Sequence, residues 1–200
     1  MKKFIVIFGI VCCFWLLGTT EGSGSGFREF RSPALMTIDS NGRAGGFDSA
    51  LEAHLNNHNR DSDLIFLLGN QYFKMNKYEK AFKVFSKDST GKNLFGAATT
   101  ARLMGDFQVA LDYYNRMSGQ SGEVHLGKGL AYRGLGQYGR AIEELTIYVN
   151  NYSKNENVFL TIAGMYVKQG NYNDAAVILR RAPKSTAVDA MLANVTARLN

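Results

Sequence analysis

The chain has 200 residues, of which 46% are apolar and only two are proline, so it can supply a continuous core and contains little that would interrupt helices. Its formal net charge of +6 weakly favours acidic partners, such as acidic protein surfaces or anionic lipid headgroups. Nucleic acid is disfavoured as a partner, because the basic residues look scattered along the chain rather than clustered between aromatic ones.

Residues 1–22 have the order of a bacterial secretory signal: two lysines, 14 apolar residues over 4–17, then small or polar residues. Fourteen residues are few for a membrane span, so we expect a cleaved signal and a periplasmic or secreted protein. An uncleaved inner-membrane anchor is the alternative. An outer-membrane lipoprotein is disfavoured, because the apolar run continues past Cys12 and Cys13 instead of ending at them.

A flexible linker is expected over residues 23–31, where Gly and Ser alternate. A helical repeat domain is then expected over residues 32–200. Its first repeat looks degenerate, with a weak helix over 32–41 and a second helix over 47–57, as is common for the terminal repeat of an array.

One motif, Gly or Asn followed by x-aromatic-x-x-Ala, organises the repeat domain. The first residue ends a helix in a left-handed conformation, the aromatic fills the notch between two antiparallel helices, and the alanine lets these helices approach closely. The five copies begin at Gly45, Asn76, Gly105, Gly136 and Gly170. Their alanines recur at intervals of roughly 30 residues, a period typical of helical-hairpin repeats.

The second copy carries the most complete signature. Asp61, Ser62 and Asp63 are expected to cap a helix from Leu64 to Lys74. Within and after this helix, the pattern W-x2-L-G-x2-Y followed by A-x3-F is kept, with Ile in place of Trp, by Ile65, Leu68, Gly69, Tyr72, Ala81 and Phe85. In these residues the chain resembles the tetratricopeptide repeat family, over about residues 32–183.

The resemblance implies an all-α fold: a right-handed α-solenoid of antiparallel helix hairpins, with about five repeats. Most of the intervals between motif alanines are shorter than the family's usual repeat length, and the family's proline between repeats is missing, so the groove shape is not carried over. A last amphipathic helix over Thr186–Asn200 has Val188, Leu192, Val195 and Leu199 on one stripe. We expect it to cap the final repeat.

Candidate chemistry is sparse. Gly134–Gly139 matches G-x-G-x-x-G, but it falls between two expected helices, whereas dinucleotide binding needs a preceding strand. His54 and His58 lie one helical turn apart without an evident third ligand, so a solvated pair is favoured over a metal site. No histidine is placed with a carboxylate and a nucleophile in a catalytic pattern. We therefore expect no catalytic residue, no metal and no cofactor.

In the tetratricopeptide family, the first helix of each hairpin lines a groove that takes an extended peptide or a partner helix. The resemblance implies partner-binding residues on the matching faces: Phe66, Asn70, Phe73, Phe95, Arg102, Leu126, Arg133 and Lys168. They would form an apolar strip beside a basic row of Lys74, Arg102, Arg133 and Lys168. The family's clamp for a C-terminal carboxylate is not expected, because it has lysine where this chain has Phe66 and Phe95.

Each part of this groove has a second interpretation. The four basic residues lie near helix C-termini, where a cation offsets the helix dipole by about 0.3–1 kcal/mol. Phe66 and Phe95 would simply belong to the core if the register were wrong by one residue.

Signal and repeats together favour a non-enzymatic scaffold of the bacterial cell envelope that binds a protein or peptide of the same compartment. The layout is similar to that of small tetratricopeptide proteins that accompany pilus-assembly or secretion machines, including tight-adherence systems. The alternative is a regulatory or adaptor subunit of an envelope enzyme such as a cell-wall synthase. Membrane association through the N-terminus is compatible with both.

Overall fold

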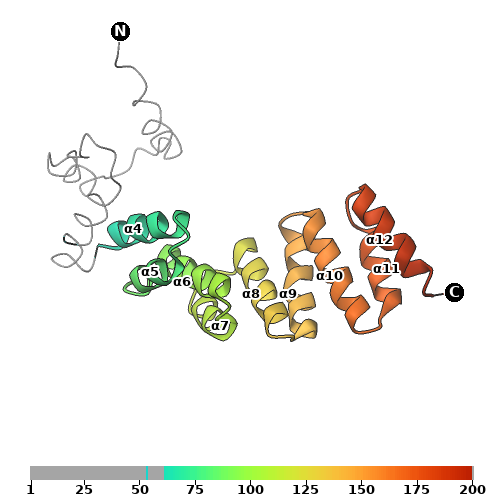
Figure 1. The fold of residues 1–200 in the computed structure, drawn as a ribbon, viewed down its shortest axis with the longest axis horizontal. Coiled ribbons are helices and arrows are strands. Elements are labelled where there is room, and N and C mark those ends of the chain that lie inside the picture. Colours follow the sequence, from blue (N-terminus) through green and yellow to red (C-terminus); the bar gives the residue numbers. More distant parts are fainter. Residues whose placement is uncertain (1–52, 54–60, 200) are drawn as a thin grey trace, which may run out of the picture. The chain divides into compact units, whose positions relative to one another are not determined.

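The computed structural model describes Ala53 and residues 61–199, so the expected signal, linker and first repeat lie outside the described residues. Within residues 61–199 the chain forms nine α-helices and no strand, which confirms the all-α expectation (Figure 1). The helices are α4 (Ser62–Lys74), α5 (Tyr78–Phe85), α6 (Gly91–Met104), α7 (Phe107–Asn115), α8 (Gly122–Gly134), α9 (Tyr138–Asn151), α10 (Glu156–Lys168), α11 (Tyr172–Arg180) and α12 (Thr186–Thr196). None of these helices combines the length and the apolar character needed to span a bilayer.

Successive helices pair into hairpins in the order of the sequence. α4 packs on α5, α6 on α7, α8 on α9, and α10 on α11. The second helix of each hairpin also packs on the helix that follows it, and the first helices α4, α6 and α8 contact one another in turn. Because contacts run mainly between neighbours, the architecture is a solenoid of helix hairpins, as the sequence predicts. Four such hairpins and α12 fall within the described part of the chain.

The turn inside each hairpin has the backbone conformation that the motif predicts. The φ angles are 91° at Gly105, 71° at Gly136 and 75° at Gly170. Asn76 takes the same place with φ of 56° and is the one non-glycine residue with a positive φ among those described. Glycine reaches this conformation freely, and asparagine tolerates it better than most residues. The copy at Gly45 lies outside the described residues.

The alanine of each motif is completely buried, which confirms its predicted role at the close contact between two helices. The four described copies, each 0% exposed, are Ala81, Ala110, Ala141 and Ala175. One helical turn further along the same helix stands a large buried side chain, in turn Phe85, Tyr114, Leu145 and Leu179. The A-x3-F register predicted for the second repeat therefore holds in all four hairpins.

The motif aromatics also join one hairpin to the next, which the sequence does not predict. The Lys168 ammonium lies 5.7 Å from the ring centroid of Tyr138 in the preceding hairpin. The Arg198 guanidinium lies 5.6 Å from the ring centroid of Tyr172, and its Nη1 donates a 3.1 Å hydrogen bond to the Tyr172 hydroxyl. Exposed contacts of this kind contribute about 0.5–1 kcal/mol each.

The start of α4 differs slightly from its expected bound. Helix α4 begins at Ser62 rather than Leu64, because Asp61 is the N-cap residue. Its Oδ1 accepts hydrogen bonds from the backbone N–H groups of Asp63 and Leu64, both at 3.0 Å.

Helix α12 is shorter than expected, since it ends at Thr196. It packs on α10 and α11 through Val188 and Val195, which are buried, whereas Leu199 of the expected stripe is 41% exposed. The Ser185 hydroxyl caps its start by accepting a 3.2 Å hydrogen bond from the Val188 N–H. Helix α12 thus covers the last hairpin, as predicted, over a shorter length.

Candidate protein-binding surface

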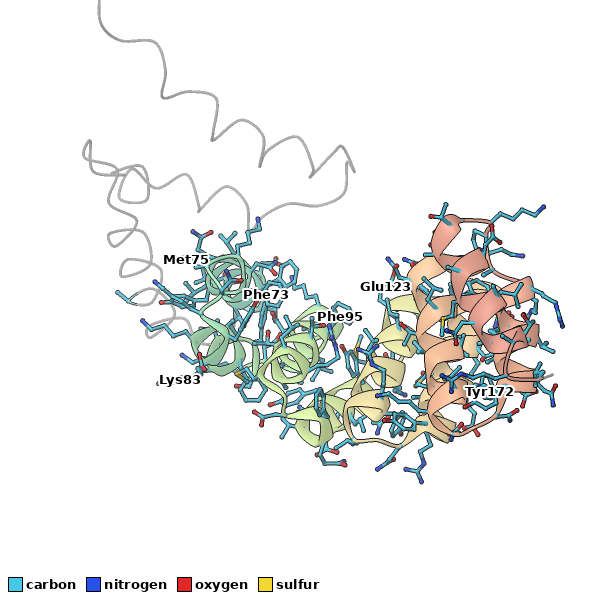
Figure 2. The ribbon with its side chains drawn as sticks, turned by 45° about the vertical axis from the view of Figure 1, so that its right-hand side comes forward. Phe73, Met75, Lys83, Phe95, Glu123 and Tyr172 are labelled. Carbon is cyan, nitrogen blue, oxygen red and sulfur yellow. The ribbon has the colours of Figure 1, made fainter. Side chains whose placement is uncertain are left out.

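The predicted partner-binding residues lie on the first helices of successive hairpins. Phe66, Asn70 and Phe73 lie on α4, Phe95 and Arg102 on α6, Leu126 and Arg133 on α8, and Lys168 on α10. Helix α6 contacts both α4 and α8, so the first seven of these residues lie on adjoining helices. We call these seven residues the α4–α8 surface. Figure 2 labels two of its aromatic side chains, Phe73 and Phe95.

Phe66 and Phe95 are half-buried, and each rests on a buried aromatic ring. The Phe66 centroid lies 6.2 Å from that of Phe85, and the Phe95 centroid lies 6.0 Å from that of Tyr114, edge to face. Both interpretations of these residues therefore apply, because each ring packs on the core and is also partly exposed. A ring held in this way loses little conformational entropy on binding.

The four residues of the predicted basic row differ in their surroundings. Lys74 is exposed in the last turn of α4. Lys168 is already engaged with the Tyr138 ring, which weakens its assignment to the groove. Arg133 is exposed, and Arg102 is half-buried. Among residues 61–199 neither arginine has a hydrogen-bond or ion-pair partner for its guanidinium, and the Nε atom of Arg102 is buried without one. Helix-dipole compensation does not account for a buried N–H that lacks an acceptor.

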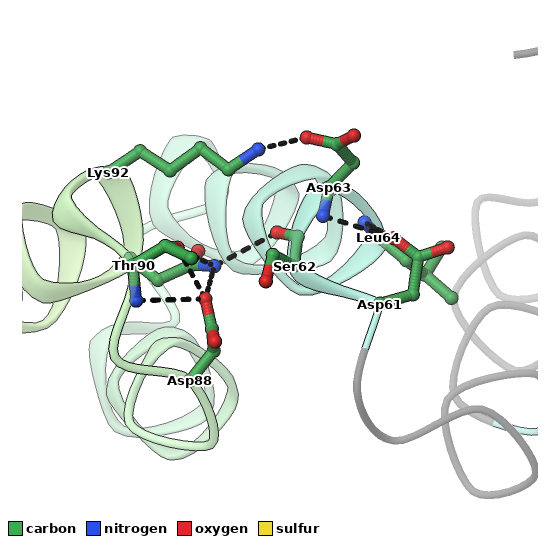
Figure 3. Close-up of polar contacts among 8 residues, drawn as sticks. Asp61, Ser62, Asp63, Leu64, Asp88, Thr90 and Lys92 are labelled. Carbon is green, nitrogen blue, oxygen red and sulfur yellow. Dashed lines mark hydrogen bonds and ion pairs between the residues drawn. The ribbon is translucent and has the colours of Figure 1, made fainter. Parts of the chain in front are cut away.

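The contact between α4 and α6 includes a residue that was not predicted, Lys92. Its ammonium pairs with the Asp63 carboxylate and lies 5.5 Å from the Phe66 ring centroid (Figure 3). Asp63 and Lys92 are separated in the sequence by the same interval as Ala81 and Ala110 of the two repeats. The opposite charges of Asp63 and Lys92, at matching positions of consecutive repeats, could therefore have predicted this ion pair from the sequence.

A polar network fixes the start of α6 beside the start of α4 (Figure 3). The Asp88 carboxylate accepts hydrogen bonds from the Thr90 N–H at 3.2 Å, from the Thr90 hydroxyl and from the Asn93 side-chain amide at 2.7 Å. That amide also donates to the Ser62 carbonyl oxygen at 2.9 Å. Burial alone would raise the pKa of Asp88, but the hydrogen bonds to the carboxylate outweigh it and lower the pKa from 3.8 to about 2.

The hairpin of α8 and α9 is held partly by polar contacts. His125 Nδ1 lies 2.6 Å from Glu144 Oε2, and the Tyr152 hydroxyl donates a 2.8 Å hydrogen bond to the Gln120 carbonyl oxygen. Lys128 is only 7% exposed, and its ammonium donates to Gln120 Oε1 at 3.3 Å. The family pattern would place larger apolar residues here, so sequence reasoning missed this cluster.

The candidate chemical motifs of the sequence fall only partly within the described part of the chain. Gly134–Gly139 spans the turn between α8 and α9, with a helix rather than a strand before it. In the described residues no three metal-ligating side chains come together. His54 and His58 lie outside the described residues.

Comparisons with known proteins define the class of fold. No protein-family model matches the chain, and no curated protein matches it. Similar solved structures include MamA residues 41 to the end from Desulfovibrio magneticus RS-1, with 15% identity and a TM-score of 0.64 over 80% of this chain and 94% of that one. A tetratricopeptide repeat protein from Parabacteroides merdae ATCC 43184 has 19% identity and a TM-score of 0.64 over 86% and 73% of the two chains.

A third similar structure is YrrB, described as a TPR protein with an unusual peptide-binding site, with 14% identity and a TM-score of 0.61 over 76% of this chain and 84% of that one. At these identities the likeness shows the fold. The chain therefore has the fold of tetratricopeptide repeat proteins, the class that its sequence motifs resemble.

Proposed function

We propose that this protein is a non-enzymatic scaffold of the bacterial cell envelope that binds an acidic, partly apolar segment of another protein on the α4–α8 surface. A pilus-assembly or secretion machine is the setting that we infer. The observation that carries the proposal is Arg102, whose Nε is buried without an acceptor among residues 61–199. The half-buried ring of Phe95 lies about two turns earlier on the same face of α6.

The unpaired Nε of Arg102 makes the isolated protein less stable. A buried donor without an acceptor costs about 1–3 kcal/mol. Nε itself is buried, so a partner carboxylate would pair with the Nη groups of the same guanidinium, which are not among the buried unpaired atoms. Such charge-assisted hydrogen bonds are among the stronger ones. The accessible side of Phe95 would anchor an apolar group of the same segment, because aromatic residues and arginine are the usual energetic centres of protein interfaces.

The envelope setting is supported by residues 1–22, whose order is typical of a secretory signal. Sequencing the N-terminus of the mature protein would test it. A mature protein that begins at Met1 in the cytosolic fraction would contradict the location without affecting the binding surface.

The binding surface is tested by isolating the native partner through copurification and mass spectrometry, then measuring its affinity and association rate. Phe95→Ala should lose on the order of 2 kcal/mol of binding free energy. Arg102→Glu combined with Arg133→Glu should slow association and flatten its salt dependence, because these charges steer the partner. Arg180→Glu combined with Lys184→Glu makes the same charge change away from this surface and serves as the matched control.

All variants must first show the thermal unfolding transition of the folded protein, because Phe95 also packs on Tyr114. If the folded Arg102/Arg133 variant binds with the rate and salt dependence of the control, these arginines do not contact the partner. If the folded Phe95→Ala variant also keeps its affinity, the α4–α8 surface is not the binding site.

A further inference from the structure

Although basic residues occur throughout the chain, net positive charge is concentrated around α5. Residues 74–87 contain Lys74, Lys77, Lys80, Lys83 and Lys87, and all five are exposed. Glu79 is the one carboxylate in this segment, so its formal charge is +4, compared with +6 for the whole chain. We call residues 74–87 the lysine segment.

Lys74 ends α4, Lys77 precedes α5, Lys80 and Lys83 lie within α5, and Lys87 follows it. The inner side of α5 consists of Ala81, Val84 and Phe85, which are buried. Lys83 lies on the side of α5 away from Phe95 (Figure 2). Within residues 61–199 none of the five ammonium groups forms an ion pair, although Lys80 lies 5.3 Å from the Tyr72 ring centroid. Among the described residues, no ion pair therefore offsets the positive charge of this segment.

We propose that the lysine segment binds the surface of a bilayer that contains anionic phospholipid. A protein interface would be expected to centre on aromatic residues and arginine, with lysine depleted. No large apolar side chain of the segment is exposed, and it contains no arginine. Lysine is a compact, strongly hydrated charge, which suits a diffuse layer of anionic headgroups that needs no desolvation.

The sequence of residues 1–22 also suggests that the protein meets a membrane. That segment is predicted to enter a membrane, either as a cleaved signal or as a retained anchor. A basic patch is the usual second signal beside a single acyl chain, and the lysines would add the same electrostatic attraction beside a retained apolar segment. After cleavage, the lysines would attach the protein by charge alone. Lys74 adjoins Phe73 of the α4–α8 surface and was predicted to belong to its basic row, whereas the other four lysines lie within α5 or close to its ends. The test below leaves Lys74 unchanged, so the inference does not depend on the proposed protein partner.

Vesicle binding of the full chain tests the proposal. We would compare vesicles of phosphatidylcholine alone with vesicles of phosphatidylcholine mixed with phosphatidylglycerol. The test variant carries Lys77→Gln, Lys83→Gln and Lys87→Gln, leaving Lys80 on Tyr72. The control variant carries Lys154→Gln, Arg180→Gln and Lys184→Gln, which remove the same charge elsewhere on the exposed surface.

We expect salt-sensitive binding to the mixed vesicles that falls by about tenfold or more in the test variant and changes by less than about threefold in the control. Circular dichroism should show the same helix content in all three proteins. Equal binding to both kinds of vesicle would assign attachment to residues 1–22 alone and overturn the proposal. Equal loss in both variants would show that net charge, not this segment, is responsible, and would overturn it as well. Absence of vesicle binding, with the test variant instead losing an acidic protein partner, would identify a protein site in its place.

Discussion

Leu145 of α9 packs directly against the backbone of Gly129 in α8. A Cβ atom added to Gly129 would lie 2.6 Å from both Cγ and Cδ2 of Leu145 and 3.3 Å from the Ala141 carbonyl oxygen. Leu145 is 0% exposed, so its side chain has no solvent to move into. Gly129 therefore contributes no side chain to this contact, and the Leu145 side chain fills the space next to its backbone.

This contact predicts that Gly129→Ala destabilises the protein by about 1–3 kcal/mol through overpacking, even though alanine favours helix more than glycine does. Gly139→Ala is the matched control in the next helix, because a Cβ atom there meets nothing within 4 Å. The control should stabilise by up to about 1 kcal/mol. Urea unfolding measures both, and a Gly129→Ala protein as stable as the control would disprove the close approach.

The buried alanine of the motif gives a second prediction. Ala141→Leu should cost about 1–3 kcal/mol, because Ala141 is 0% exposed and no space is available for the larger side chain. Gln137→Leu, at an exposed position one helical turn earlier, should change stability by less than about 0.5 kcal/mol. Thermal unfolding of the two variants tests the repeat register, which is wrong if the two losses are equally small.

The left-handed backbone at Asn76 predicts that its replacement by alanine and by glycine will differ in stability. Asn76→Ala should destabilise by about 1 kcal/mol, because alanine is strained at a φ of 56° and cannot accept the 2.9 Å hydrogen bond from the Tyr78 hydroxyl. Asn76→Gly loses the same hydrogen bond but relieves the strain, so it should be more stable than Asn76→Ala. Differential scanning calorimetry that ranks alanine above glycine would contradict the turn geometry.

The network at Asp88 predicts a defined dependence of stability on pH. Its folded pKa of about 2 is lower than its ordinary value of 3.8, so its charge stabilises the fold fully above about pH 5. That contribution, about 1–2 kcal/mol after allowance for partial exposure, is lost as the pH falls from about 4 to about 2.

Asp88→Asn should therefore be less stable than the natural protein near neutral pH, and the difference should shrink toward pH 2. Comparing the two proteins at each pH cancels the titration of the other carboxylates. A difference that stays constant from pH 6 to about pH 2 would show that the Asp88 charge is not stabilised by its hydrogen bonds.

The sequence predicts the fold well where local chemistry decides it. Asn76 and the glycines of the turns need a left-handed backbone, and the motif alanines need close contact, so both could be placed without coordinates. The surroundings of Lys168 could not, because its contact with Tyr138 depends on how one hairpin stacks on the next. The burial of Lys128 could not be predicted either, because it depends on the hydrogen bond from its ammonium to Gln120.

For the candidate surface, the sequence predicted which helices carry the residues. What the sequence could not supply is the state of each side chain on those helices. Phe66 and Phe95 are shared between core and surface because of the rings behind them, and only the structure distinguishes Arg102, with its buried Nε, from the exposed Arg133.

The register of the last helix means that further helices could be added to the array by protein engineering. Ser185 follows Asn155 at the same interval at which Arg198 follows Lys168, and each later residue repeats the role of its counterpart as helix cap or as cation over a tyrosine. Helix α12 therefore has the position of a first helix whose second helix is absent from the described residues. A copy of α11 with its turn, grafted after residue 199, would meet a surface already spaced to receive it, so the chain offers a ready point for adding binding modules.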